Sequence, residues 1–203
     1  MAGKTGPEPR IATVERKTTE SDISVTINLD GAGTAEIDTG NGMLKHMLDA
    51  FARHGSFDLK VRAQGDHSMG WHHVLEDTGI VLGRAVDQAL GDKRGIVRMA
   101  SAIVPLDEAL SRVVIDISGR GYGVVDMGTP RYEGEFSSDE VRHFLEAFAI
   151  EGRMALHATV LSGKNDHHRS EATFKALARA LRAAVALDSR NPDAIPSTKG
   201  VID

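Results

Sequence analysis

The sequence contains two copies of one pattern, and this duplication limits what the chain can fold into. Residues 45–61, KHMLDAFARHGSFDLKV, match residues 142–160, RHFLEAFAIEGRMALHATV. Each segment begins with a basic residue, a histidine, an apolar pair and an acidic residue, followed by Ala-Phe-Ala. We interpret the chain as two related halves, residues 1–93 and 94–203, so its fold must be one small module built twice.

Each half also carries an adjacent histidine pair with a glutamate three positions after the second histidine. The residues of the two motifs are His72, His73 and Glu76 in the first half, and His167, His168 and Glu171 in the second. These pairs are 95 residues apart, and the single histidines His46 and His143 are 97 residues apart. Such a small difference between offsets is what short loop insertions between matched elements would produce.

The local patterns predict the same order of elements in both halves: strand, hairpin, strand, helix, strand, helix. Residues 25–33 resemble residues 113–121, and we expect the hairpins to turn at Asp30-Gly31 and near Gly119–Gly121. Alternating apolar residues predict strands at 24–29, 56–61 and 96–106, whereas helical spacing predicts helices over 43–53 and 140–149. Gly91 is placed to end a helix. The expected architecture is an α/β sandwich of two equivalent modules.

Composition excludes several classes of protein. The 203 residues include no cysteine, so disulfides and thiolate metal sites are impossible. A net charge of −5 and few aromatic residues argue against nucleic-acid binding. We find neither a signal peptide nor an apolar run of the roughly 20 residues that would span a membrane. We therefore expect a cytoplasmic protein without a membrane or nucleic-acid partner.

The repeated histidines and glutamates have the spacing of metal ligands. On a helix His72 and Glu76 share a face, whereas the adjacent histidine lies about 100° around the axis. We therefore expect each motif to contribute to two metal sites, with about four protein ligands per ion. Nitrogen and carboxylate ligands suit Mn, Fe, Co, Ni or Zn. Two closed structural zinc sites are the alternative, although such sites often use thiolates.

A second group of residues suits a phosphate monoester, because arginine, lysine and serine donate hydrogen bonds to phosphate oxygens. The group consists of Arg98, Arg120, Lys175, Ser197 and Lys199. Lys175 lies one helical turn beyond Glu171. Spacing alone does not show that these residues converge.

These segments together resemble the imidazoleglycerol-phosphate dehydratase family. The resemblance rests on HMLDAFARHGSFDL, HHVLEDTGIVLG, PLDEALSRVVIDISGR, HFLEAFA, HHRSEATFKALARALR and PSTKG, which cover roughly residues 14–200. It implies an α+β fold of two β-β-β-α-β-α modules, with the helices packed between two mixed sheets. It also implies an enzyme with two Mn²⁺ sites, assembled as a 24-subunit homo-oligomer with active sites between subunits.

The reaction implied by the resemblance removes water from D-erythro-1-(imidazol-4-yl)glycerol 3-phosphate, giving 3-(imidazol-4-yl)-2-oxopropyl phosphate in histidine biosynthesis. The family's metal ligands fall on His46, His72, His73, Glu76, His143, His167, His168 and Glu171. The expected catalytic residues are Glu20 as general acid/base, with Glu76, Asp107 and Glu171. The phosphate contacts fall on Arg98, Arg120, Lys175, Ser197 and Lys199.

Three positions depart from the family's pattern. Lys45 stands where the family usually has aspartate, Trp71 where it commonly has an acidic residue, and Ala50 where a glutamine is frequent. A carboxylate beside a ligand histidine orients the imidazole, so these changes bear on the strength of activity. His54 matches a recurrent family histidine whose role is equally well structural.

Two other functions are compatible with the same residues. A metal-dependent hydrolase of a phosphorylated metabolite would use the ions to generate hydroxide, with Glu20 or Glu76 as base. A non-catalytic scaffold would use the metals only to stabilise an assembly. Formation of a keto product that retains its phosphate distinguishes the dehydratase from both.

Overall fold

The computed structural model describes residues 9–66, 70–129 and 136–202. In these ranges both halves form the same six elements in the same order. The first half contains β1 (Ile11–Lys17), β2 (Ser21–Asn28), β3 (Ala35–Thr39), α1 (Gly42–Gly55), β4 (Asp58–Gly65) and α2 (His72–Leu90). The second contains β5 (Met99–Leu106), β6 (Ala109–Asp116), β7 (Tyr122–Asp126), α3 (Ser138–Glu151), β8 (Ala155–Ser162) and α4 (Asp166–Val185).

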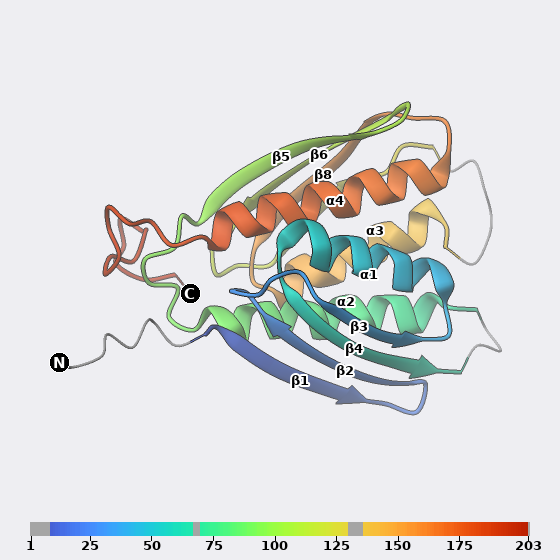
Figure 1. The fold of residues 1–203 in the computed structure, drawn as a ribbon, viewed down its shortest axis with the longest axis horizontal. Coiled ribbons are helices and arrows are strands. Elements are labelled where there is room, and N and C mark those ends of the chain that lie inside the picture. Colours follow the sequence, from blue (N-terminus) through green and yellow to red (C-terminus); the bar gives the residue numbers. More distant parts are fainter. Residues whose placement is uncertain (1–8, 67–69, 130–135, 203) are drawn as a thin grey trace.

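The two sheets have identical topology. Their strand orders are β1-β2-β4-β3 and β5-β6-β8-β7, and in each sheet only the last pair is parallel. The four helices lie in a layer between the sheets (Figure 1). The expected α+β sandwich of duplicated modules is therefore confirmed.

Buried and exposed side chains alternate along the strands because one face of each sheet contacts the helices. In β2 the side chains of Ile23, Val25 and Ile27 are fully buried, and in β6 Val113 and Ile115 occupy the equivalent positions. One apolar core runs through both halves. The modules therefore share their hydrophobic interior.

Helix pairs cross between the halves: α2 packs on α3, and α1 packs on α4. Glycines allow the α2–α3 approach. A Cβ added to Gly79 would lie 2.5 Å from Phe144 O, and one added to Gly83 would lie 2.6 Å from Phe148 O. Larger residues would force these helices apart.

All four helices point the same way, with their N-terminal ends on the right of Figure 1. Local capping sets several ends. Asn41 Oδ1 accepts a hydrogen bond from Leu44 N at the start of α1, and Asn165 Oδ1 accepts one from His168 N at the start of α4. At the other end of α2, Gly91 has a φ of 56° and ends the helix as predicted.

The predicted hairpins at Asp30-Gly31 and Gly119–Gly121 are wrong. These turns connect β2 to β3 and β6 to β7, which are separated in their sheets by β4 and β8. The antiparallel hairpins are instead β1–β2 and β5–β6. Glycine at a turn suits positive φ but does not reveal whether the flanking strands pair.

The strand predicted over 96–106 begins only at Met99. Before it, Val97 N and Arg98 N donate to Ala186 O and Ala184 O at the C-terminal end of α4. Because these amides donate to the helix terminus, the paired strand begins at Met99, and only the carbonyl of Arg98 extends the ladder, by accepting from Ile117 N at 3.1 Å.

Candidate functional site

The six histidines of the repeated motifs lie near the N-terminal ends of the four helices. His72 and His167 fall in the first turns of α2 and α4, while His46 and His143 lie one turn into α1 and α3. Since α1 packs on α4 and α2 packs on α3, each single histidine meets the paired motif of the other half.

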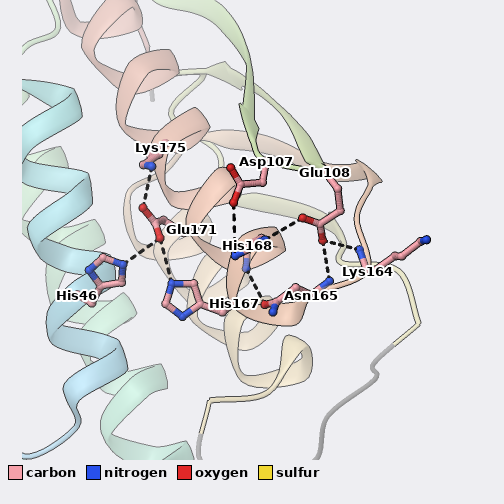
Figure 2. Close-up of polar contacts among 9 residues, drawn as sticks. All are labelled: His46, Asp107, Glu108, Lys164, Asn165, His167, His168, Glu171 and Lys175. Atoms are coloured by element: carbon pink, nitrogen blue, oxygen red, sulfur yellow. Dashed lines mark hydrogen bonds and ion pairs between the residues drawn. The ribbon is translucent and has the colours of Figure 1, made fainter.

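One cluster contains His46, His167 and Glu171 (Figure 2). Glu171 Oε2 lies 2.9 Å from His46 Nε2 and 3.1 Å from His167 Nε2. One ligand atom from each residue lies within 4.8 Å of the others, as required for binding a common ion. Three predicted metal ligands are therefore brought together within one chain.

A matching cluster contains His72, Glu76 and His143. The rings of His72 and His143 have centroids 4.8 Å apart, and His72 Nε2 lies 3.6 Å from Glu76 Oε2. His143 Nε2 accepts a hydrogen bond from Arg142 Nη2 at 2.8 Å and lies 3.4 Å from Asp139 Oδ2. This cluster is looser than the first, although it joins the equivalent elements.

The second histidine of each pair faces a carboxylate on the neighbouring hairpin. His168 Nδ1 lies 2.8 Å from Glu108 Oε2, and His73 Nδ1 lies 3.5 Å from Glu20 Oε2. Asp107, predicted as a site residue, is farther away, with its Oδ2 3.9 Å from His168 Nε2. Thus the two histidines of one pair contact different groups.

Glu108 is a site residue that the sequence patterns missed. It follows Glu20 by 88 residues, the same offset that relates β2 to β6. Extending that offset back from the strand into the preceding hairpin would have identified Glu108 rather than Asp107 as the equivalent of Glu20.

Glu171 is held as an anion. Burial alone would raise its pKa, but hydrogen bonds from Lys175, His46 and His167 outweigh burial and lower it to about 2. Lys175 Nζ lies 2.7 Å from Glu171 Oε1, and both side chains are largely buried. The structure thus places Lys175 on the carboxylate of the His46–His167–Glu171 cluster rather than beside the other predicted phosphate contacts.

Glu108 and His168 also affect one another's charge. The hydrogen bond with His168, followed by those from the Lys164 and Asn165 amides, lowers the pKa of Glu108 to about 2. The same hydrogen bond raises the pKa of His168. Both shifts favour the charged forms, an ionised carboxylate beside a protonated imidazole.

Four predicted phosphate contacts line one cavity of about 140 Å³. They are Arg98, Arg120, Ser197 and Lys199, joined there by Ser118. The Arg98 guanidinium bonds both carboxylate oxygens of Asp116, at 2.7 and 3.1 Å, and donates to Pro196 O at 2.8 Å. The convergence expected for an anion pocket is present for these four residues.

The anion pocket and the His46–His167–Glu171 cluster lie at opposite ends of α4. His167 is near the start of the helix, whereas Arg98 N bonds Ala184 O near its end. At 1.5 Å per residue, the intervening 17 residues extend for about 25 Å. The two parts of the predicted site are therefore well separated within one chain.

The departures from the family's pattern have local partners. Lys45 Nζ forms an ion pair with Asp49 Oδ2 at 2.8 Å, and Trp71 and Ala50 are buried. Asp166, which precedes the second histidine pair as Trp71 precedes the first, bonds Arg169 Nη1 at 2.7 Å. The half-buried His54 has a pKa lowered by burial and by the nearby Lys175 and Arg179.

The fold and the site define the class of protein: a duplicated α+β protein with two histidine–carboxylate clusters near the N-terminal ends of its helices. Residues 39–181 match the family model described as imidazoleglycerol-phosphate dehydratase. The chain belongs to the imidazoleglycerol-phosphate dehydratase family and is a dehydratase of histidine biosynthesis. The resemblance drawn from the motifs is thereby confirmed.

Relatives and solved structures agree with this assignment. The chain is 55% identical over 195 residues to the imidazoleglycerol-phosphate dehydratase of Roseiflexus sp., covering 95% of this chain and 98% of the relative. It is 52% identical over 195 residues to that of Dehalococcoides mccartyi, covering 96% and 98%.

Two crystal structures of imidazoleglycerol-phosphate dehydratase share the fold at 37% identity. The Staphylococcus aureus structure has a TM-score of 0.77, covering 88% of this chain and 99% of that one. The Pyrococcus furiosus structure has a TM-score of 0.80, covering 93% and 99%. In the part of the chain that the structure describes, no helix is long and apolar enough to cross a membrane.

Proposed function

We propose that the chain removes water from D-erythro-1-(imidazol-4-yl)glycerol 3-phosphate, giving 3-(imidazol-4-yl)-2-oxopropyl phosphate, at a site that binds two Mn²⁺ ions. The observation that carries this proposal is the convergence of His46, His167 and Glu171 from two helices of different halves. Family membership supports the reaction, and the clustered donors support the metal.

The donor set fits such an ion. Two imidazole nitrogens and an ionised carboxylate are ligands that Mn²⁺ and related ions accept, and the chain has no thiolate to favour a closed zinc site. Held by these residues, the ions would supply positive charge that stabilises negative charge developing on the substrate's imidazole ring. The same proposal assigns five further ligands, which are His72, His73, Glu76, His143 and His168.

Glu20 is proposed as the general acid/base. Its side chain is 60% exposed at the tip of the β1–β2 hairpin, beside His73. A carboxylate there is free to take the proton from the carbon next to the one that bears the departing hydroxyl. The proton and hydroxyl together account for the water lost, and the resulting enol becomes the ketone.

Arg98, Arg120, Ser197 and Lys199 are proposed to bind the phosphate. Asp116 supports this role because its two oxygens hold the Arg98 guanidinium in one orientation. Lys175 pairs with Glu171 within one chain. As a phosphate contact, Lys175 would reach a phosphate that is bound in the pocket of a neighbouring subunit.

We further propose that active sites form between subunits of a 24-subunit homo-oligomer in the cytoplasm. The substrate spans roughly 10 Å at about 1.5 Å per bond, less than half the separation of the metal cluster and the anion pocket. One copy's cluster must therefore meet another copy's pocket. Exposed apolar side chains on the outer face of the second sheet support such contacts; they include Met99, Ile103, Val114, Tyr122 and Val124.

The test is turnover of imidazoleglycerol phosphate by metal-stripped protein, before and after addition of Mn²⁺. We expect a keto product with its phosphate retained, formed only when metal is present. Release of inorganic phosphate would instead support the hydrolase. Absence of turnover in protein with confirmed bound Mn²⁺ would overturn the proposed function.

A further inference from the structure

Glu108 connects the β5–β6 hairpin to the first turn of α4. Its Oε1 accepts hydrogen bonds from the backbone amides of Lys164 and Asn165, both at 2.9 Å, and its Oε2 lies 2.8 Å from His168 Nδ1 (Figure 2). Both carboxylate oxygens are therefore used, and the side chain has one defined orientation.

This arrangement determines which nitrogen of His168 carries hydrogen. An ionised carboxylate only accepts hydrogen bonds, so Nδ1 must be the donor to Glu108. In the neutral ring this leaves the Nε2 lone pair available. Asp107 Oδ2, at 3.9 Å, is too far from Nε2 to form a hydrogen bond with it. The backbone is held as well, because His168 N donates to Asn165 Oδ1 at 3.2 Å.

The equivalent glutamate of the first half is held differently. Glu20 approaches the same nitrogen of His73 only to 3.5 Å, and its side chain is mostly exposed. The next residue, Ser21, bonds the buried Asp77, which also pairs with Arg16. The hydrogen bond from Ser21 to Asp77 therefore links the first hairpin to α2, and the Glu20 carboxylate is not needed for this link.

The second half has no equivalent of the Ser21–Asp77 hydrogen bond. Ala109 follows Glu108 as Ser21 follows Glu20, and Ala172 occupies the position in α4 that Asp77 occupies in α2. Neither alanine can form the polar contact. In this half the carboxylate of Glu108 links the hairpin to the start of α4, and Ser111 bonds Thr173 farther along the same strand and helix. Duplication has therefore given two equivalent glutamates different constraints.

We propose that Glu108 is a positioning residue, which holds the His168 imidazole with Nε2 directed to a metal ion, while Glu20 remains free for proton transfer. The role rests on the proposed function, because it requires that His168 ligate a metal. A carboxylate on the far nitrogen of a ligand histidine fixes the ring's orientation and tautomer. Glu108 supplies this constraint although it lies outside the repeated motifs.

The discriminating variant is Glu108→Gln. Glutamine keeps an oxygen for the amides of Lys164 and Asn165 but presents an N–H group to His168 Nδ1. Nδ1 would then have to accept, which places the hydrogen on Nε2 and blocks its lone pair. Glu36→Gln is the matched control, since it makes the same substitution at an exposed glutamate of β3 that pairs with Lys60 and belongs to neither histidine cluster.

The measurement is titration of each full-length, metal-stripped protein with Mn²⁺, following free Mn²⁺ by electron paramagnetic resonance. We expect Glu108→Gln to weaken one of the two sites per chain by about 10- to 100-fold and leave the other within threefold. Glu36→Gln should keep both affinities, and all three metal-free proteins should melt at similar temperatures.

Three results would overturn the positioning role: unchanged Mn²⁺ affinity in Glu108→Gln, equal losses in the two variants, or weakening of both sites with a lower melting temperature. The last would indicate a disrupted α4 terminus. Wild-type protein that binds no Mn²⁺ would instead refute the metal-dependent function itself, so the two failures are distinguishable.

Discussion

His46 of α1 and Glu171 of α4 are 125 residues apart in the sequence, yet His46 Nε2 lies 2.9 Å from Glu171 Oε2. The rings of His143 of α3 and His72 of α2 have centroids 4.8 Å apart. Both contacts join one half of the chain to the other. Neither half alone contains a complete cluster, so the duplicated modules form one functional unit as well as one core.

Loss of either paired-motif histidine should therefore stop the reaction. We expect His167→Ala and His72→Ala each to lower kcat by about 10³-fold or more, because ligands of one site act as a unit. Steady-state kinetics at saturating Mn²⁺ would show this. The matched control is His157→Ala, an exposed histidine on β8. Near-normal kcat in either motif variant would remove that residue from the metal site.

The sequence predicts those parts of the fold and site that repeat. Val25 and Val113 are 88 residues apart, the same offset that separates the starts of β2 and β6, and both side chains are fully buried. His167 and Glu171 are one helical turn apart, so their convergence follows from helix geometry. Periodicity and repetition are local properties, which explains why a single sequence reveals them.

The errors and omissions concern contacts that local sequence does not encode. Asp30-Gly31 has hairpin chemistry, but the next strand pairs with β4, which is reached only after a helix. Lys175 suits a phosphate, but its nearest anion is Glu171. Glu108 lacks a motif of its own, and its importance depends on the backbone amides of residues 164 and 165. Each depends on long-range packing.

The anion pocket gives a prediction about substrate affinity. Lys199→Ala should raise KM for imidazoleglycerol phosphate by about 10-fold, because one charge-assisted hydrogen bond contributes roughly 1.5 kcal/mol or more. A smaller change in kcat is expected, since the pocket is remote from the reacting carbons. Arg190→Ala, in the same C-terminal segment and paired with Asp188, is the control. An unchanged KM in Lys199→Ala would exclude Lys199 from the phosphate site.

Asp58 gives a prediction about acid stability. A hydrogen bond from the Thr34 hydroxyl lowers the pKa of Asp58 most, and the backbone amides of Ala32 and Thr34 lower it further, to about 2. Because the folded-state pKa lies below the usual value of 3.8, the ionised carboxylate stabilises the fold above pH 4, and this contribution is lost as the pH falls toward 2.

Asp58→Asn should therefore lower the free energy of unfolding at pH 7, by about 0.5–1 kcal/mol because solvent screens this exposed carboxylate, with a smaller difference near pH 2. Urea denaturation at several pH values would measure it. Asp38→Asn, an exposed residue of the neighbouring strand β3, controls for general charge effects. Equal pH dependence in both variants would contradict the role assigned to the Asp58 hydrogen bonds.

Separation of the metal cluster from the anion pocket predicts complementation between subunits. His167→Ala destroys the first and Lys199→Glu the second, so each variant alone should be inactive. If an active site takes its cluster from one copy and its pocket from another, random co-assembly pairs intact parts in up to about a quarter of the sites. Mixing the variants after metal removal, followed by Mn²⁺, should recover a corresponding share of wild-type turnover. The double variant His167→Ala/Lys199→Glu, mixed with wild type, controls for simple dilution. If verified mixed assemblies remain inactive, both parts must come from the same subunit, and the 25 Å separation would have to close by movement within the chain.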